Sequence, residues 1–151
     1  MNILKKFNNR IKYELGELYV IYNNVSIKWN KENKVIIEIS NDNNNIKFIL
    51  DESYPFSAPN ALINNVNYND FVKLPSFRMK ELLYKNFNKK CLCCSSLLHC
   101  NNWTPTRKFT VVVDEIITIQ TFKKNICNIL LIDKIKEKYL NRDIEIQKFL
   151  F

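Results

Sequence analysis

Apolar residues recur along the chain with two different periods, and these periods predict the order of its structural elements. Residues 3–18 carry apolar side chains at three- and four-residue steps, which places them on one face of a helix. Alternating apolar residues then predict strands within 19–29, at 35–39 and at 46–50, with polar, turn-like tracts at 30–33 and 40–45. A short strand is expected at 61–63. Short loops between such strands predict an antiparallel meander with one face on the core.

Helical periodicity returns in the second half of the chain. An irregular helix broken at Pro75 is expected over residues 71–83, and a longer helix over 110–132, although Val111–Val113 could also begin as a strand. Residues 133–151 continue as one or two amphipathic helices. Gly16, the only glycine, falls near the expected end of the first helix. No repeat or linker divides the chain, so we predict one α+β domain over residues 1–151.

Composition narrows the class of protein. The chain has 151 residues, 46% hydrophobic and 25% charged, as in ordinary globular proteins. No apolar run approaches the roughly 20 residues that cross a bilayer, so no contact with a membrane is expected. The N-terminus lacks the continuous apolar stretch of a secretory signal, which predicts a cytoplasmic, reducing compartment. Clustered cysteines there are catalytic or metal-binding more often than disulfide-bonded.

The formal net charge of +8 raises the question of nucleic-acid binding. The basic residues are scattered rather than arranged in a stripe, and no arginine-rich motif occurs, so we do not expect a nucleic-acid partner. The chain is rich in Lys, Asn and Ile, a bias typical of an AT-rich genome. The composition is compatible with a viral or protist source, and for a virus the compartment would be the host cytoplasm or nucleus.

Residues 84–105 concentrate the chemically reactive side chains. This segment holds four of the five cysteines, the only histidine and one of the two tryptophans. A nucleophilic thiol or a metal site would explain the density. A zinc site could draw its four ligands from Cys91, Cys93, Cys94, His99 and Cys100, or from this set without Cys94 if Cys94 is the nucleophile. Trp103 is expected in the core, and Cys127, outside the cluster, as a small buried side chain.

Two motifs carry a resemblance to a known family. Tyr54-Pro55-Phe56-Ser57-Ala58-Pro59 resembles the Tyr-Pro-Phe-x-x-Pro segment of the ubiquitin-conjugating enzymes, and Trp103-Thr104-Pro105 resembles the Trp-Ser/Thr-Pro that follows their active-site cysteine. The number of residues between Trp103 and the next expected helix also agrees with that family. The resemblance implies a divergent member of that family, because Tyr84 and Lys85 stand where the family has His and Pro.

The resemblance implies a cysteine nucleophile that carries a modifier protein, ubiquitin or a ubiquitin-like protein, as a thioester and transfers this modifier to a lysine. Cys94 begins the stretch Cys-Ser-Ser-Leu-Leu-His, which is similar to the Cys-Ile-Ser-Ile-Leu-His of some members. Asn86 lies eight residues earlier, where the family places its oxyanion-stabilising Asn. Cys91 is the alternative nucleophile, because Cys91-Leu92 matches the family's common Cys-Leu pair.

The resemblance also implies partners. They are ubiquitin or a ubiquitin-like protein, a ubiquitin-activating enzyme, a RING-type ligase and protein substrates, while no cofactor and no ATP site are expected. Two alternatives stay open: a non-catalytic ubiquitin-binding variant of the same fold, and a zinc-stabilised protein-interaction module. The residues matching the family's partner surfaces are the basic helix face for the activating enzyme (Lys5, Lys6, Arg10) and two loops for the ligase (Phe56, Pro105, Thr106).

Overall fold

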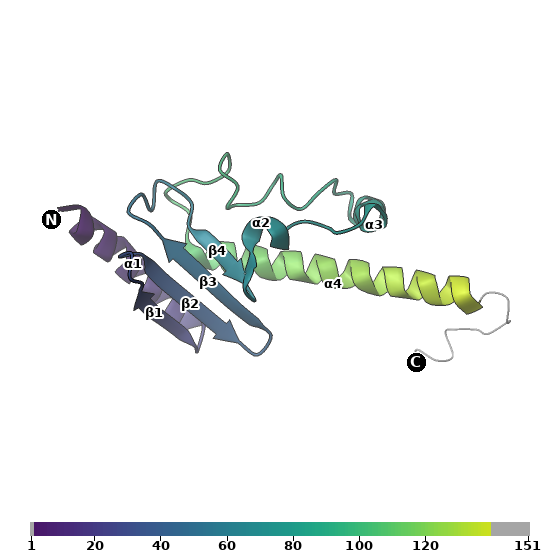
Figure 1. Ribbon diagram of the computed structural model, residues 1–151, viewed down its shortest axis with the longest axis horizontal. Helices are drawn as coiled ribbons and strands as arrows, with labels where there is room; N and C mark the ends of the chain where they lie inside the picture. The colour runs from purple at the N-terminus through teal and green to yellow at the C-terminus, as the bar shows by residue number, and fades with distance from the viewer. Residues whose placement is uncertain (1, 140–151) are drawn as a thin grey trace. The chain divides into compact units, whose positions relative to one another are not determined.

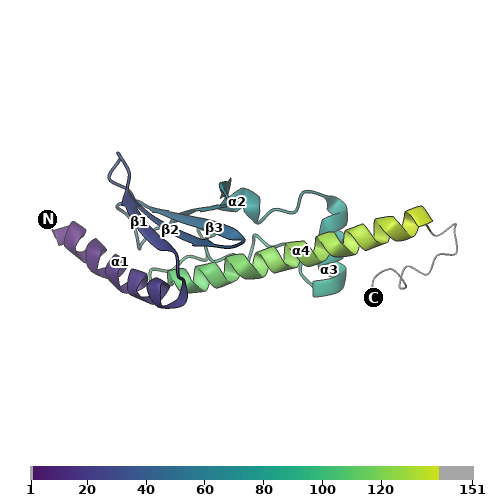
Figure 2. The same cartoon turned by 90° about the horizontal axis from the view of Figure 1, so that it is seen from below.

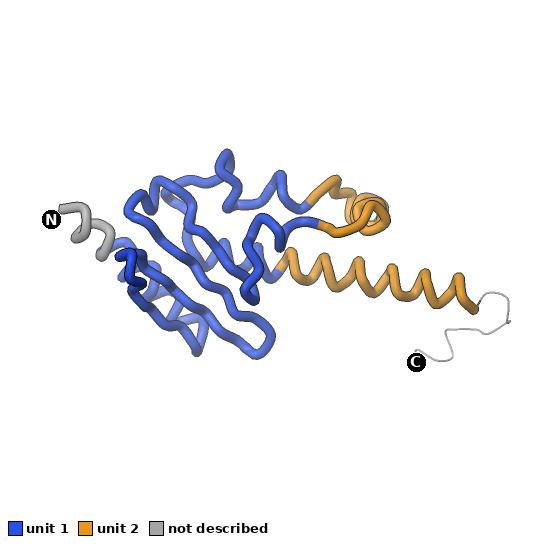
Figure 3. The backbone as a smooth tube through the Cα atoms, in the orientation of Figure 1, with its two compact units in different colours: residues 1–73, 92–117 blue, residues 74–91, 118–151 orange. Residues whose placement is uncertain are grey.

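The computed structural model describes residues 2–139, with the side chains from Asn9 onward. The chain forms two compact units, coloured separately in Figure 3 and each described by itself. Unit 1 consists of Met1–Lys73 and Leu92–Ile117, and unit 2 of Leu74–Cys91 and Thr118–Phe151. The expected α+β class, with an N-terminal helix, an antiparallel sheet and C-terminal helices, is confirmed. Among the described residues, no helix is both long and apolar enough to cross a bilayer.

Helix α1 spans Asn2–Ile21, longer than the sequence period predicts. Its core-facing residues Ile11, Leu15 and Leu18 are buried, as the helical spacing requires. The expectation that the chain turns into a strand at Tyr19 is wrong, because Tyr19–Ile21 form the last exposed turn of α1. Gly16 therefore lies inside the helix, where a Cβ would meet nothing within 4 Å, rather than at its end.

Five strands form an antiparallel meander in the order β1-β2-β3-β4-β5. Burial alternates along the strands predicted at 35–39, 46–50 and 61–63, and Val35, Ile37 and Ile39 all face the core. The strand predicted within 19–29 forms only over Val25–Trp29, and burial does not alternate along it. The last strand was missed, because it has two residues and follows a turn in which Asn64 and Asn65 adopt positive φ. The strands are β1 (Val25–Trp29), β2 (Val35–Asn41), β3 (Asn44–Leu50), β4 (Asn60–Ile63) and β5 (Val66–Asn67).

Two helices cover one face of this sheet in unit 1. Figures 1 and 2 show α1 and the first turns of α4 (Phe109–Tyr139) on the same side of the strands. Phe109 opens α4 and stacks on Phe48 of β3 at 4.8 Å and on Tyr54 at 5.5 Å between ring centroids. Buried aromatic surface of this kind is a large source of stability. The core of unit 1 therefore lies directly beneath the start of α4.

Buried Glu14 joins these elements through hydrogen bonds. Its carboxylate, in a side chain 1% exposed, pairs with the Arg10 guanidinium at 2.6 Å and accepts a hydrogen bond from the Phe109 backbone N–H at 2.8 Å. The first N–H groups of a helix have no partner within the helix, so Glu14 satisfies one of them for α4. Burial raises the pKa of Glu14 above its usual value of 4.5, against the lowering effect of these partners.

Pro75 separates two helices, so the expected break is confirmed while the expected extent of 71–83 is not. Helix α2 (Tyr68–Phe71) precedes Pro75 in unit 1, and α3 (Phe77–Phe87) follows it in unit 2. Ser76 caps α3 by accepting from the Met79 N–H.

Helix α4 begins at Phe109, so Val111–Val113 are helical rather than extended. It runs to Tyr139, and the rest of the expected C-terminal helices lies outside the described residues. In unit 2 the rings of Phe87 and Phe122 pack edge to face, with 5.1 Å between their centroids. Cys127, expected to be buried, is exposed on α4.

Candidate active site

The predicted nucleophile lies in a stretch of unit 1 that has no helix or strand. The second segment of unit 1 begins at Leu92, and its residues 92–108 form successive turns that lead into helix α4. Cys94 is exposed, Cys93 is half-buried, and His99 and Cys100 are exposed. An exposed thiol on irregular backbone is accessible to a large protein partner, as thioester chemistry requires.

Glu115, on the second turn of α4, fixes this stretch to the core of unit 1. Its carboxylate accepts a hydrogen bond from the Leu97 backbone N–H at 2.8 Å and another from the Tyr68 hydroxyl of α2. Burial, reinforced by the bond to Glu115, raises the pKa of Tyr68 far above its usual value, so the hydroxyl keeps its proton to donate. Leu92 and Ser96 are buried on either side of Cys94.

Asn102 makes a second attachment, closer to the thiol. Its side-chain amide donates to the backbone carbonyls of Cys94 at 2.9 Å and Ser96 at 3.0 Å. Sequence reasoning missed Asn102, because asparagine is common along this chain and neither family-like motif includes this residue. Only its place immediately before Trp103 could have drawn attention to it.

The thiols themselves lie close together. The sulfurs of Cys93 and Cys94 are 3.9 Å apart, and those of Cys91, Cys93 and Cys94 all lie within 4.8 Å of one another in this continuous stretch of chain. Three thiolates could hold a soft metal ion such as zinc, with a fourth ligand from solvent. Among the described residues, this set differs from the one expected from sequence, since His99 and Cys100 instead contact each other at 4.0 Å.

A hydrogen bond joins the two motifs that resemble the ubiquitin-conjugating enzymes. The indole N–H of Trp103 donates to the Pro55 carbonyl at 2.8 Å, and the Tyr54–Pro55 peptide is cis. Trp103 is half-buried, packing at 6.2 Å from the Tyr54 ring. The Tyr-Pro-Phe segment and the Trp-Thr-Pro segment are thus tied together, and both leave side chains outward, with Phe56 80% exposed and Pro105 also exposed.

The predicted basic face of α1 is described only in part. Arg10 contacts other residues of unit 1, since it pairs with Glu14 and donates to the Arg107 carbonyl at 3.0 Å. The side chains of Lys5 and Lys6 lie outside the described part of the chain. Thr106, from the expected ligase surface, is exposed, and its hydroxyl lies 3.2 Å from that of Thr104.

The predicted oxyanion residue belongs to unit 2, whereas Cys94 belongs to unit 1. Asn86 lies in the last turns of α3, where its amide donates to the Leu82 carbonyl at 2.9 Å. Lys89, which follows α3, places its ammonium 5.4 Å from the centroid of the Phe122 ring within unit 2. The catalytic role of Asn86 stays a prediction.

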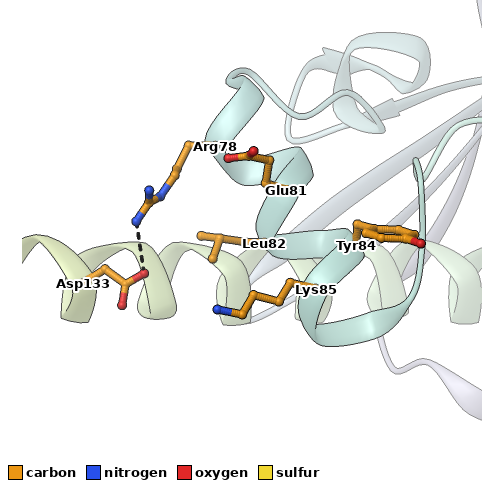
Figure 4. A pocket seen from close by; sticks show the side chains of 6 residues that line it. All are labelled: Arg78, Glu81, Leu82, Tyr84, Lys85 and Asp133. Atoms are coloured by element: carbon orange, nitrogen blue, oxygen red, sulfur yellow. Dashed lines mark ion pairs between the residues drawn. The ribbon is translucent and has the colours of Figure 1, made fainter.

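Unit 2 has a pocket of about 390 Å³ between α3 and α4, drawn in Figure 4. One end is bounded by an ion pair between Arg78 and Asp133 at 3.5 Å. None of the residues predicted to be functional lines it. The wall mixes both signs of charge with apolar surface, a lining without clear preference for one ligand: Arg78, Glu81, Leu82, Tyr84, Lys85 and Asp133.

Comparisons with protein-family models, curated proteins and solved structures found no match to this chain. Function is therefore inferred from the residues and the geometry of the site.

Proposed function

We propose that this chain is a ubiquitin-conjugating transferase that carries ubiquitin or a related modifier on Cys94. One observation carries the proposal. The exposed thiol belongs to the same compact unit as both family-like motifs, and the hydrogen bond from Trp103 to Pro55 joins those motifs. A helix, an antiparallel meander and an irregular cysteine segment leading into a second helix form the scaffold of this unit.

The chemistry requires a thiolate and access for two proteins in turn. The Cys94 thiolate attacks the carbonyl carbon of the modifier's thioester on the activating enzyme, a new C–S bond forms, and the activating enzyme's cysteine leaves as a thiolate. A substrate lysine amine then attacks the Cys94 thioester. The amide forms, the amine loses its proton, and the Cys94 sulfur leaves. Asn86 is proposed to donate a hydrogen bond to the oxyanion of this second step.

The partner surfaces belong to the same proposal. Phe56 and Pro105 of the joined motifs are exposed, as is Thr106, which follows the second motif. This exposure suits a docking surface for a RING-type ligase. Helix α1 would meet the activating enzyme. Because Arg10 is paired with buried Glu14, we expect Lys5 and Lys6 to supply the contact and Arg10 to order the helix. A reducing compartment such as the cytoplasm would keep all five cysteines as thiols.

A charging assay tests the proposal. The protein is mixed with ATP, an activating enzyme and ubiquitin or another modifier, and analysed on reducing and non-reducing gels. We expect a thiol-sensitive adduct in wild type, its loss in Cys94→Ala, and its retention in Cys91→Ala. Cys100→Ala is the matched control, because Cys100 is also an exposed thiol of this segment. If the adduct were lost only in Cys91→Ala, the nucleophile would be Cys91 rather than Cys94.

A second candidate is favoured by the closeness of the thiols of Cys91, Cys93 and Cys94. In a tetrahedral zinc site with Zn–S bonds of about 2.3 Å, neighbouring sulfurs lie about 3.8 Å apart, near the 3.9 Å between Cys93 and Cys94. Such a chain would be a zinc-stabilised interaction module. Stoichiometric zinc together with no adduct for any modifier would favour this candidate. No adduct and no zinc would favour a non-catalytic, ubiquitin-binding variant of the fold.

A further inference from the structure

We propose that Asn102 is a positioning residue that holds Cys94 in the orientation needed for transfer between two proteins. The inference rests on the proposed function and adds a residue to it. Its basis is the pair of hydrogen bonds from one side-chain amide to the carbonyls of Cys94 and Ser96.

The amide of Asn102 acts on the backbone that carries the thiol. A carboxamide nitrogen has two hydrogens in a fixed plane, so donating both of them fixes the spacing of the two acceptors. The Ser96 N–H donates in turn to the Cys93 carbonyl at 3.2 Å, which closes a turn around Cys94. Residues 92–108 contain no strand or helix, so the shape of this turn depends on that backbone bond and on the side-chain bonds of Asn102 and Glu115.

Hydrogen bonds also attach Asn102 itself to the core of unit 1. Its backbone N–H donates to the His99 carbonyl at 2.8 Å, and its carbonyl accepts from the Arg107 Nε at 2.9 Å. The Arg107 carbonyl accepts from Arg10, and Arg10 pairs with buried Glu14 at 2.6 Å. A continuous series of hydrogen bonds therefore runs from the buried carboxylate of α1 to the carbonyl of Cys94.

Orientation matters for some reactions of a thiol and not for others. A thioester held on a second protein can reach Cys94 from a restricted range of directions, so a small change in the turn lowers the rate sharply. A small alkylating reagent can approach an exposed thiol from many directions. Loss of a positioning residue should therefore slow charging and leave alkylation nearly unchanged.

Four variants separate this role from a general loss of structure. Asn102→Ala removes both donors, and Asn102→Asp replaces them with a carboxylate that repels the two carbonyls. Asn102→Gln keeps both donors on a longer side chain. Asn101→Ala is the matched control, because Asn101 is an exposed neighbour of the same type whose side-chain oxygen contacts only the Cys100 thiol, at 3.7 Å, among the contacts described.

The first measurement is hydrogen exchange of the peptide that contains residues 93–99, resolved by mass spectrometry. We expect exchange about tenfold faster in Asn102→Ala and Asn102→Asp, wild-type exchange in Asn101→Ala, and an intermediate value in Asn102→Gln. Unchanged exchange in both Asn102→Ala and Asn102→Asp would overturn the proposal, whatever the outcome of the charging assay. Circular dichroism identifies a variant that fails to fold. If Asn102→Ala fails to fold, the difference in hydrogen exchange between Asn102→Asp and Asn102→Gln decides whether the two donors hold the turn.

The second measurement compares charging with alkylation of Cys94 by iodoacetamide. We expect the maximal charging rate of Asn102→Ala to fall by about ten- to a hundredfold, with alkylation within about twofold of wild type. A parallel fall in both would mean that Asn102 acts on the reactivity of the thiol, which overturns positioning. If wild type accepts no modifier, the proposed function and this role fail together, while altered exchange would still establish the attachment itself.

Discussion

Replacing Glu14 should destabilise unit 1 more than replacing any exposed carboxylate, because Glu14 is a charged group in the core with two strong partners. The side chain is 1% exposed and binds the Arg10 guanidinium and the Phe109 N–H at 2.6 and 2.8 Å. The Tyr54 hydroxyl lies 3.5 Å from the same carboxylate. Removing the carboxylate leaves these donors without their acceptor beneath the start of α4.

The magnitude follows from the burial of each partner. Breaking a fully buried ion pair costs about 3–5 kcal/mol. Arg10 is 28% exposed, so water can replace part of the lost interaction, and for Glu14→Ala we expect about 2–4 kcal/mol. Glu14→Gln keeps the volume but offers one oxygen instead of two, so it can satisfy only one of the two donors. We expect that variant to lose about 1–3 kcal/mol.

The effect should also depend on pH, because burial raises the pKa of Glu14 above 4.5. A carboxyl with a raised pKa in the folded state contributes its stability fully below its unfolded pKa and loses it as pH rises through the folded value. The advantage of wild type over Glu14→Gln should therefore be greatest at pH 4.5 and below, and should shrink toward neutral pH. The other carboxyls are common to both proteins and cancel in the difference.

Urea unfolding followed by tryptophan fluorescence measures this directly, because both tryptophans, Trp29 and Trp103, belong to unit 1. Glu17→Gln serves as control, since Glu17 forms a more exposed ion pair with Lys108. A loss under about 1 kcal/mol in Glu14→Ala would refute the structural role of Glu14. An advantage over Glu14→Gln that grows as pH rises would refute the direction of the pKa shift.

Three further predictions concern the attachments around the site. Trp103→Phe keeps an aromatic side chain but loses the pyrrole part of the indole and, with it, the bond to the Pro55 carbonyl. The free energy of unfolding in urea should fall by about 0.5–1.5 kcal/mol, and no change would mean that this bond does not help to join the two motifs. Tyr68→Phe deprives Glu115 of a buried donor and should cost about 1–3 kcal/mol, measured by thermal unfolding, with a loss below that range arguing against the bond. Asn86→Ala should slow discharge to lysine more than charging in single-turnover assays, and equal effects on the two steps would remove Asn86 from the proposed mechanism.

The periodicity of apolar residues was sufficient for most of the fold. Strict alternation predicted β2 and β3 because one face of each strand packs on the core, and their registers pair the buried positions, such as Ile37 with Phe48. The prediction failed at Tyr19–Ile21, where a β-branched and aromatic run resembles a strand but extends α1 beyond buried Leu18. Such short apolar runs fit both periods, so only tertiary packing decides between them.

The sequence by itself determined which residues could do chemistry: a dense group of thiols, two family-like motifs and an amide eight residues before Cys94. Only the tertiary structure decided which groups hold that chemistry in place. Asn102, Glu115 and Glu14 look unremarkable in sequence, because each acts on a backbone group six or more residues away, up to 95 for Glu14. Hydrogen bonds depend on distance and direction in space, and local periodicity carries no information about either between remote segments.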